Sequence, residues 1–111
     1  MSDTVTLPKE KIKAKEENKP KILPPYHVVL LNDNDHSFEY VIAMMQKLFG
    51  HPREKGTLIA WEVHTQGRSI VDTTSKERAE LKRDQIHAFG PDKDIPRCKG
   101  SMSSVIEPAP Q

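Results

Sequence analysis

The stretch that decides the fold is HVVLLNDNDHSFEYVIAMMQKLFG, residues 27–50 of a chain of 111. It opens with β-branched and aliphatic residues, which predict a strand over 27–31, and continues with Asn and Asp residues, which predict a turn over 32–35. From Phe38 onward the apolar side chains recur at the spacing of an amphipathic helix, and Gly50 is expected to end it. The stretch therefore predicts a strand, a polar turn and a helix in direct succession.

The rest of the chain continues this alternation. We expect a second helix from Pro52 through His64, because proline is tolerated in a first helical turn, and Gly67 is expected to end it. The remaining expected elements are a strand over 69–73, a helix from a capping box at 74–77 to about 89, and a strand over 102–107. The order β-α-α-β-α-β is α/β in composition and α+β in layout.

The polarity of the chain is concentrated at its start. Residues 1–22 hold six lysines, four acids and no aromatic residue. Such a segment has too little apolar surface to offset the entropy of ordering it. We therefore expect a flexible tail over 1–23, ended by Pro24 and Pro25, and one small domain over 24–111.

The composition excludes several classes of protein. The net charge is +1, whereas nucleic-acid binding needs a clear basic excess. One cysteine excludes an internal disulfide framework and a Cys-based zinc site. No apolar run is long enough to span a membrane and no signal peptide is present, so we expect a cytoplasmic protein without a membrane or nucleic-acid partner.

The densest polar cluster is NDNDH, residues 32–36. A strand-to-helix loop explains it by itself, since Asn and Asp are favoured there. Alternatively, its acceptors could hold a cation such as an α-amino group beside an apolar pocket, provided that the carboxylates outweigh the helix dipole, which favours anions.

Catalytic and metal sites find little support. The five histidines include no pair at helical i, i+4 spacing, so no metal site and no cofactor are expected. Asp35, His36 and Ser37 are three triad residue types, but chain neighbours cannot easily form the relay. Cys98 is interpreted as an exposed, unreactive thiol.

His64 differs from the other histidines because Gly56, Ala60 and His64 follow one another at four-residue spacing on one line of the second helix. It could simply be favoured by the dipole at the end of a helix. It could instead reach the acidic loop and make one more hydrogen bond there.

These residues resemble the ClpS family of adaptor proteins. The resemblance rests on VVLLND at 28–33, FEYVI at 38–42, VHTQG at 63–67, AELK at 79–82 and IEPA at 106–109. It covers about residues 24–96 and resumes near Met102. It implies a three-stranded antiparallel sheet packed against three helices, in a monomer that recognises proteins by an N-terminal Leu, Phe, Tyr or Trp. It also implies delivery of these proteins to a ClpA- or ClpC-type AAA+ unfoldase of the bacterial Clp protease.

The resemblance assigns roles to individual residues. The resemblance implies that Asn32, Asn34 and His64, together with Asp33, bind the α-amino group of the substrate. It implies that the N-terminal side chain of the substrate binds in a pocket lined by Leu30, Leu31, His36, Phe38, Val41, Ala60, Val63 and Met102. Glu77 and Lys82 match the family's unfoldase-binding face, and the tail matches its delivery element.

The chain departs from the family pattern at several of these positions. Asn34 replaces the usual aspartate, and His36 replaces the threonine that usually caps the helix, so Asp35 is expected to cap it instead. Phe38 and Ala60 each replace a methionine of the pocket. We expect an altered ranking of N-terminal residues that favours bulky aromatic side chains.

Two other classes stay open. One is a small interaction domain of similar fold that does not bind N-terminal residues, for which His64 would be dispensable. The other is an enzyme that uses His64 and the acidic loop as a base, but the sequence shows no nucleophile, phosphate-binding loop or metal set to go with it.

Overall fold

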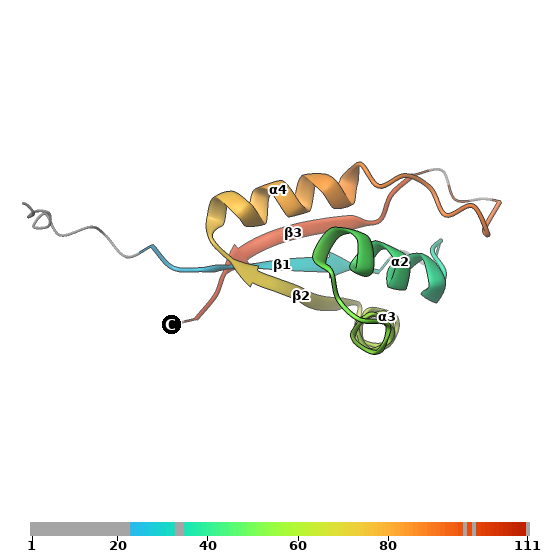
Figure 1. The fold of residues 1–111 in the computed structure, drawn as a ribbon, viewed down its shortest axis with the longest axis horizontal. Coiled ribbons are helices and arrows are strands. Elements are labelled where there is room, and N and C mark those ends of the chain that lie inside the picture. Colours follow the sequence, from blue (N-terminus) through green and yellow to red (C-terminus); the bar gives the residue numbers. More distant parts are fainter. Residues whose placement is uncertain (1–22, 33–34, 97, 99, 111) are drawn as a thin grey trace, which may run out of the picture.

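A computed structural model describes residues 23–32, 35–96, 98 and 100–110. The elements, in chain order, are β1 (Tyr26–Leu31), α2 (Phe38–Phe49), α3 (Arg53–Gln66), β2 (Arg68–Thr74), α4 (Lys76–His87) and β3 (Ser103–Pro108). The expected order β-α-α-β-α-β is confirmed (Figure 1). The expectation of a flexible tail concerns residues outside the described ones, except for Leu23, and stays a prediction.

The strands form one antiparallel sheet, as expected, and their order in it is β2-β1-β3. The central strand β1 pairs with β2 from Tyr26 opposite Thr74 to Leu31 opposite Arg68. A shift in this register between Val28 and Val29 marks a β-bulge in the pairing. Along its whole length β1 also pairs with β3, so the first strand of the domain holds the last one.

The two faces of the sheet differ. Val28 and Leu30 of β1 point to the face that packs against the helices, and both are completely buried. Val29 points to the other face, where its cross-strand neighbours are Ile70 and Val105. An ion pair between Arg68 of β2 and Glu107 of β3 joins the two outer strands, with a distance of 2.5 Å between its charged atoms.

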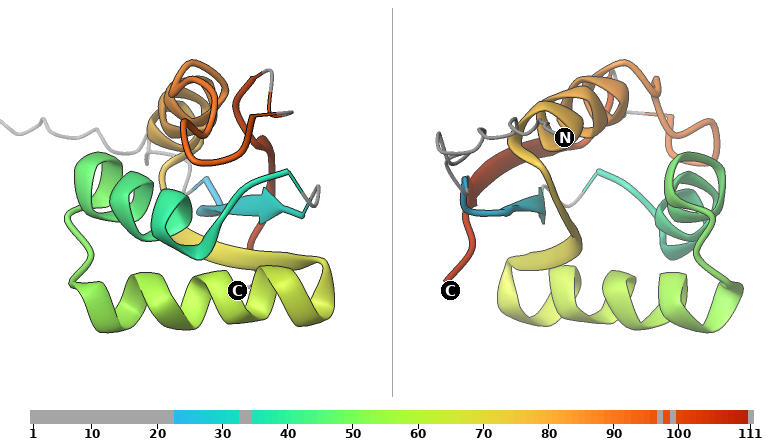
Figure 2. Two further views of the ribbon diagram at one scale, coloured as in Figure 1. Left: turned by 90° about the vertical axis from the view of Figure 1, so that its right-hand side faces the viewer. Right: turned by 60° about the vertical axis from the view of Figure 1, so that its left-hand side comes forward.

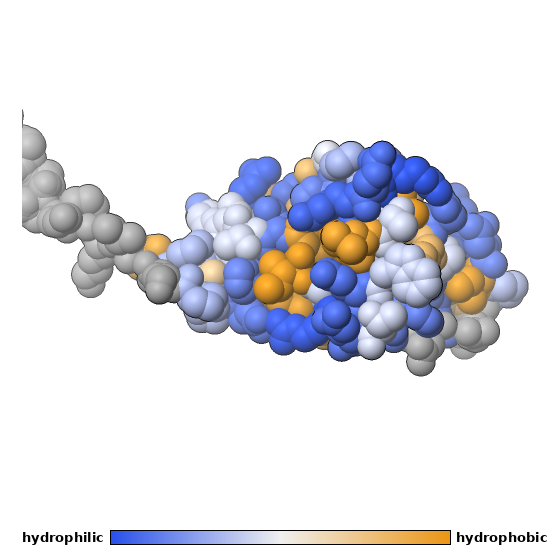
Figure 3. All heavy atoms as spheres, turned by 90° about the horizontal axis from the view of Figure 1, so that it is seen from below, coloured by the Kyte–Doolittle hydropathy of each residue, from blue (hydrophilic) through white to orange (hydrophobic). Residues whose placement is uncertain are grey.

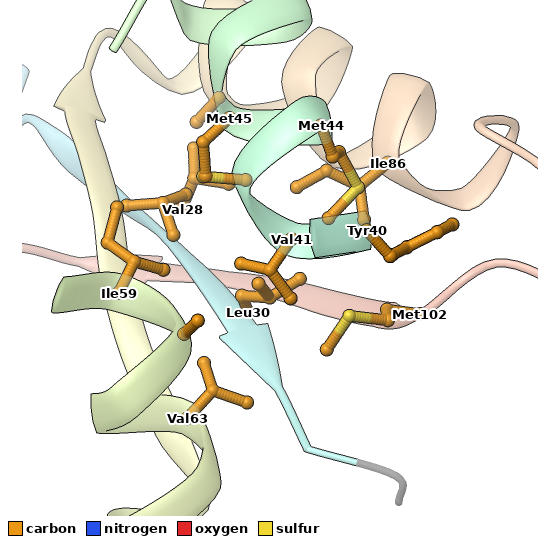
Figure 4. Close-up of a cluster of buried hydrophobic side chains, with 13 residues drawn as sticks. Val28, Leu30, Tyr40, Val41, Met44, Met45, Ile59, Val63, Ile86 and Met102 are labelled. Atoms are coloured by element: carbon orange, nitrogen blue, oxygen red, sulfur yellow. The ribbon is translucent and has the colours of Figure 1, made fainter. Parts of the chain in front are cut away.

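The core lies between the sheet and the helices. Figure 2 shows α2 beside the sheet, with α4 and α3 at its two edges. The buried side chains at the centre come from every layer, and Figure 4 shows them pointing toward one another: Val28, Leu30, Val41, Met44, Met45, Ile59, Val63, Ile86 and Met102. Gly56 lets α3 approach α2 closely, because a Cβ atom at this position would lie 3.1 Å from the Cα atom of Ile42.

Three details of the helix ends correct the sequence-based expectations. The N-cap of α2 is Ser37, whose hydroxyl accepts a hydrogen bond from the Tyr40 amide, and not Asp35. The N-cap of α4 is Ser75, which accepts from the Arg78 amide, because Thr74 is still paired in the sheet. The last helix ends at His87, two residues earlier than expected.

The outer side of α3 and β2 carries a separate apolar surface. Leu58 and Ile70 are 57% and 45% exposed and line a hollow of about 400 Å³ between the helix and the strand. Figure 3 looks at this side of the molecule and shows apolar residues surrounded by hydrophilic ones. Among the described residues, no helix is long and apolar enough to cross a membrane.

Candidate functional site

Three segments of the fold meet at one end of the sheet. They are the end of β1, the start of α2 and the second half of α3, and Figure 2 (left) looks at this end. The Asn32 amide donates a hydrogen bond to the Gly67 carbonyl at 3.1 Å, which fixes the start of the polar loop against the end of α3. Asn32 and His64, the described residues assigned to the α-amino group, therefore belong to segments that are joined here.

Most of the residues expected to line the pocket belong to one apolar cluster. Its buried members are Leu30, Val41, Ala60, Val63 and Met102, each at most 4% exposed, and Phe38 packs against them. Figure 4 shows that Val41 of α2, Val63 of α3 and Met102, which directly precedes β3, point toward Leu30. The apolar side of the expected site is therefore continuous with the core.

Two expected pocket residues lie apart from this cluster. Leu31 follows Leu30 in a strand, so its side chain points to the opposite face of the sheet. The His36 ring lies against Tyr40, with 4.5 Å between the ring centres, and its Nε2 atom is 2.8 Å from the Gly100 carbonyl oxygen. His36 is thus directed toward the segment that follows α4. Its assignment to the pocket, like that of Leu31, stays a prediction.

The start of α2 is tied to the segment after α4 by a buried carboxylate. Asp92 Oδ2 accepts a hydrogen bond from the Ser37 amide at 2.7 Å, and Oδ1 accepts one from the Asp94 amide at 2.9 Å. Burial alone would raise the pKa of Asp92, but these hydrogen bonds outweigh it and hold the pKa below its ordinary value. The Tyr40 hydroxyl adds a bond to the Gly90 carbonyl, and burial raises the pKa of this phenol.

Cys98 lies within this connection and not on the surface, which corrects the sequence-based interpretation. Its side chain is buried, its sulfur accepts a hydrogen bond from the Asp92 amide, and His36 Nε2 lies 3.2 Å away. The signal that could have revealed this is weak, since a polar loop around a cysteine is typical of an exposed thiol. The described residues hold no group of three or more side chains that could bind a metal ion.

Three aromatic rings contact one another beside the apolar cluster. Phe38, the first residue of α2, lies edge-on to His64, with 5.8 Å between the ring centres. The exposed His64 is in the last turn of α3, so Phe38, an expected pocket residue, and His64, an expected amino-binding residue, are adjacent. Trp61 contacts both rings and was missed by the sequence reasoning, although its i, i+3 spacing from His64 indicates a shared helix face.

The remaining candidate residues are distributed as follows. Asp33 and Asn34 lie outside the described residues, so their assigned roles stay predictions. Lys82 donates a hydrogen bond from its Nζ atom to the Leu48 carbonyl near the end of α2. Glu77 is exposed in the first turn of α4. It lines a hollow of about 600 Å³ together with Leu23, Pro24, Pro25, Ser75, Lys76 and Glu80.

Known proteins place this arrangement in one class. The family model described as "ATP-dependent Clp protease adaptor protein ClpS" matches residues 21–96. A relative from Xanthomonas campestris, named ATP-dependent Clp protease adapter protein ClpS, is 37% identical over 76 residues, which cover 67% of this chain and 72% of the relative. The protein of that name from Desulforapulum autotrophicum is 32% identical over 88 residues, covering 79% and 85% of the two chains.

The class of protein is therefore an adaptor of an ATP-dependent protease. The chain belongs to the ClpS family of Clp protease adaptors. Among solved structures it is similar to ClpS2 of Agrobacterium tumefaciens bound to L-phenylalaninamide. The TM-score is 0.68 at 23% identity, and the match covers 79% of this chain and 100% of the other, which shows the same fold.

Proposed function

We propose that this protein binds proteins that carry a bulky hydrophobic N-terminal residue and delivers them to a ClpA- or ClpC-type unfoldase for degradation. The observation that carries the proposal is the position of His64 and Asn32 at the rim of the apolar cluster. A polar group that accepts hydrogen bonds beside an apolar wall suits a ligand with a charged amine next to a large side chain. The ligand of the Agrobacterium relative, L-phenylalaninamide, has this chemistry.

Selection of chain ends follows from the chemistry of the α-ammonium group. It offers three N–H donors, and Asn32, Asn34 and His64 supply acceptors, with Asp33 contributing charge. An internal residue offers one amide N–H and no charge, so it would leave buried acceptors unpaired. The replacement of the family's aspartate by Asn34 removes one negative charge, which Asp33 or Asp35 would have to supply.

Selection among first residues follows from the apolar cluster. Burial of a side chain in it is favourable by about 0.8 kcal/mol per methylene group, so large side chains bind best. A stiff ring at Phe38 and a small side chain at Ala60 change the shape that a methionine pair would give. We propose that the ranking shifts toward bulky aromatic first residues.

Delivery would use the other end of the domain. Glu77 and Lys82 are proposed to contact the unfoldase, and the tail over residues 1–23 is proposed to approach its pore. The tail would leave the domain beside Pro24 and Pro25, which line the same hollow as Glu77. In this proposal the protein is a cytoplasmic monomer that would bind its unfoldase and its substrate at different ends of the sheet.

The proposal is tested by titrating the full chain with dye-labelled peptides that differ only in their first residue. We expect binding for Phe, Tyr, Trp and Leu, with aromatic residues ahead of Leu, and loss of binding when the same peptides are acetylated at the N-terminus. Binding that is indifferent to the first residue or to acetylation would identify the alternative, an interaction domain of this fold without N-terminal recognition.

Delivery has its own experiment. Deletion of residues 1–22 should preserve peptide affinity but stop degradation of an N-terminal Phe substrate by the unfoldase and protease. If the protease degrades the substrate at the normal rate with the deletion variant, the tail has no role in delivery, and the proposal for substrate binding is unaffected.

A further inference from the structure

Three aromatic rings contact one another beside the apolar cluster of the proposed pocket, and one of them, Trp61, has no assigned role. The ring centres of Phe38 and Trp61 are 5.1 Å apart with an interplanar angle of 87°. Phe38 and His64 meet at 68°, and Trp61 and His64 at 74° with 6.3 Å between centres. Each pair is edge-on, the arrangement in which the positive ring edge meets the negative ring face.

The three rings differ in what they contact. Phe38 is partly buried and packs against the core cluster, whereas Trp61 is 53% exposed. Trp61 and His64 stand one turn apart on α3, and Phe38 reaches them from the start of α2. The Phe38 ring therefore lies between the apolar cluster on one side and the Trp61 ring on the other.

A ring at the first position of a helix needs such a contact to be fixed. Side chains of a helix lean toward the turn before their own residue, and Phe38 has no preceding helical turn to pack on. Its orientation is thus set by tertiary neighbours, and of the two exposed rings that contact it, Trp61 is the larger and the nearer. Without that ring, Phe38 could adopt several orientations, and the opening that it guards would have no single shape.

We propose that Trp61 is a positioning residue that sets substrate specificity by holding the Phe38 ring at the pocket mouth. The inference rests on the function proposed above and extends it to a residue outside the assigned pocket. A fixed aromatic gate leaves a narrow, flat opening, which admits a planar Phe or Tyr side chain more readily than the branched side chain of Leu. Loss of Trp61 should therefore reduce selectivity more than it reduces overall affinity.

The experiment compares Trp61→Ala and Trp61→Phe in the full chain, with Leu58→Ala as the matched control. Leu58 is a similarly exposed apolar residue of α3, but it lines the hollow on the β2 side. Affinities for Phe-, Tyr- and Leu-started peptides are measured by fluorescence anisotropy of a dye on the peptide. We expect Trp61→Ala to reduce the preference for Phe over Leu by about 2- to 12-fold, the range that one edge-to-face ring pair supplies. Trp61→Phe should keep most of the preference, and Leu58→Ala should keep all of it.

A second measurement needs no variant. Trp61 is the one tryptophan of the chain, so intrinsic fluorescence reports on this ring alone. Binding of a Phe-started peptide without tryptophan should change the emission, and the acetylated peptide should not. This readout keeps the inference testable if the alanine variant fails to fold.

The outcomes distinguish failure of the positioning role of Trp61 from failure of the proposed recognition of N-terminal residues. Equal weakening of all peptides by Trp61→Ala, or an unchanged preference, overturns the positioning role while the proposed function stands. The positioning role is also overturned if the Trp61 emission does not change on addition of a peptide whose binding is detected by anisotropy. A wild-type chain that binds none of the peptides overturns both.

Discussion

Helices α3 and α4 flank the same sheet but present different chemistry. The buried face of α3 is a line of small and branched residues, Gly56, Ile59, Ala60 and Val63, whereas α4 buries Ala79 and Ile86. The neighbouring surface of α3 carries Trp61 and His64, next to a ring from α2. The neighbouring surface of α4 is mostly charged, with Glu77 in its first turn.

This difference indicates a division of labour. Small side chains on α3 let α2 approach closely and bring Phe38 beside His64, so close packing of this helix would form the proposed recognition site. On α4 a charged side chain serves packing as well, since Lys82 donates to a carbonyl of α2. The predictions below test whether recognition is confined to α3 and support to α4.

The largest effect is expected from a pair of histidines, one in the last turn of each helix. His64→Ala should weaken binding of a Phe-started peptide about 13- to 160-fold, because a hydrogen bond to a charged group is lost, while thermal stability changes little because the side chain is exposed. His87, whose Nε2 atom lies 3.1 Å from the Ser104 amide, provides the comparison. His87→Ala should lower stability and leave peptide affinity as it is. The division fails if His87→Ala impairs binding as strongly as His64→Ala does.

A second prediction concerns the close approach of α2 and α3. Gly56→Val should lower the free energy of unfolding by about 1–3 kcal/mol, since even its Cβ atom would meet the Ile42 backbone. The control is Lys55→Val, which introduces the same β-branched side chain at an exposed position of the same helix. Urea denaturation measures both variants. Valine is a better helix former than glycine, so a Gly56→Val variant that is as stable as wild type would show that the contact with Ile42 does not constrain this position.

A third prediction concerns the segment after α4 and follows from the lowered pKa of Asp92. Because the folded-state pKa lies below the unfolded value of about 3.9, Asp92 contributes stability above that pH and loses it as the pH falls through the folded pKa. Asp92→Asn should therefore be less stable than wild type at pH 7, by about 1–2 kcal/mol. The difference should shrink as the pH falls below about 4. Urea denaturation at several pH values measures both proteins. A stability difference between them that stays constant from pH 7 to pH 3 would contradict this prediction.

The smallest effects are expected on α4. Lys82→Met should lower stability by about 1 kcal/mol, because the Leu48 carbonyl loses its charged donor, whereas the exposed Glu77→Ala should change stability by less than about 0.5 kcal/mol. If both residues belong to the proposed unfoldase-binding face, each variant also weakens association with the unfoldase without changing peptide affinity. Normal association of Lys82→Met would restrict Lys82 to its structural role.

The sequence predicted the fold well because its patterns are local. The aliphatic run of β1, the apolar periodicity of α2 and the glycines that end two helices each act within a few residues. The helix caps were less predictable, because several capping residue types stand side by side and tertiary contacts choose among them. Asp92 binds the Ser37 amide, and pairing in the sheet retains Thr74 as a strand residue.

The candidate site shows the same limit. Val41, Val63 and Met102 come together from distant segments, which the family resemblance anticipated and no local pattern could. The role of Trp61 could not be predicted, because its partner Phe38 is on another helix. The burial of Cys98 could not be predicted either, because it depends on contacts with Asp92 and His36. Local spacing identifies the residues of one helix face, but it does not reveal which neighbour covers them.

The strand order has a consequence for synthesis of the protein. Residues 26–31 leave the ribosome before both of their partner strands, and one of these partners is made of residues 103–108, so the central strand waits for nearly the whole domain. Leu30 and Met102, which contribute to the same apolar cluster, can meet only then. A nascent or truncated chain that lacks the last strand should therefore have an incomplete apolar cluster and lack the proposed recognition site, even though it already contains the residues proposed for delivery.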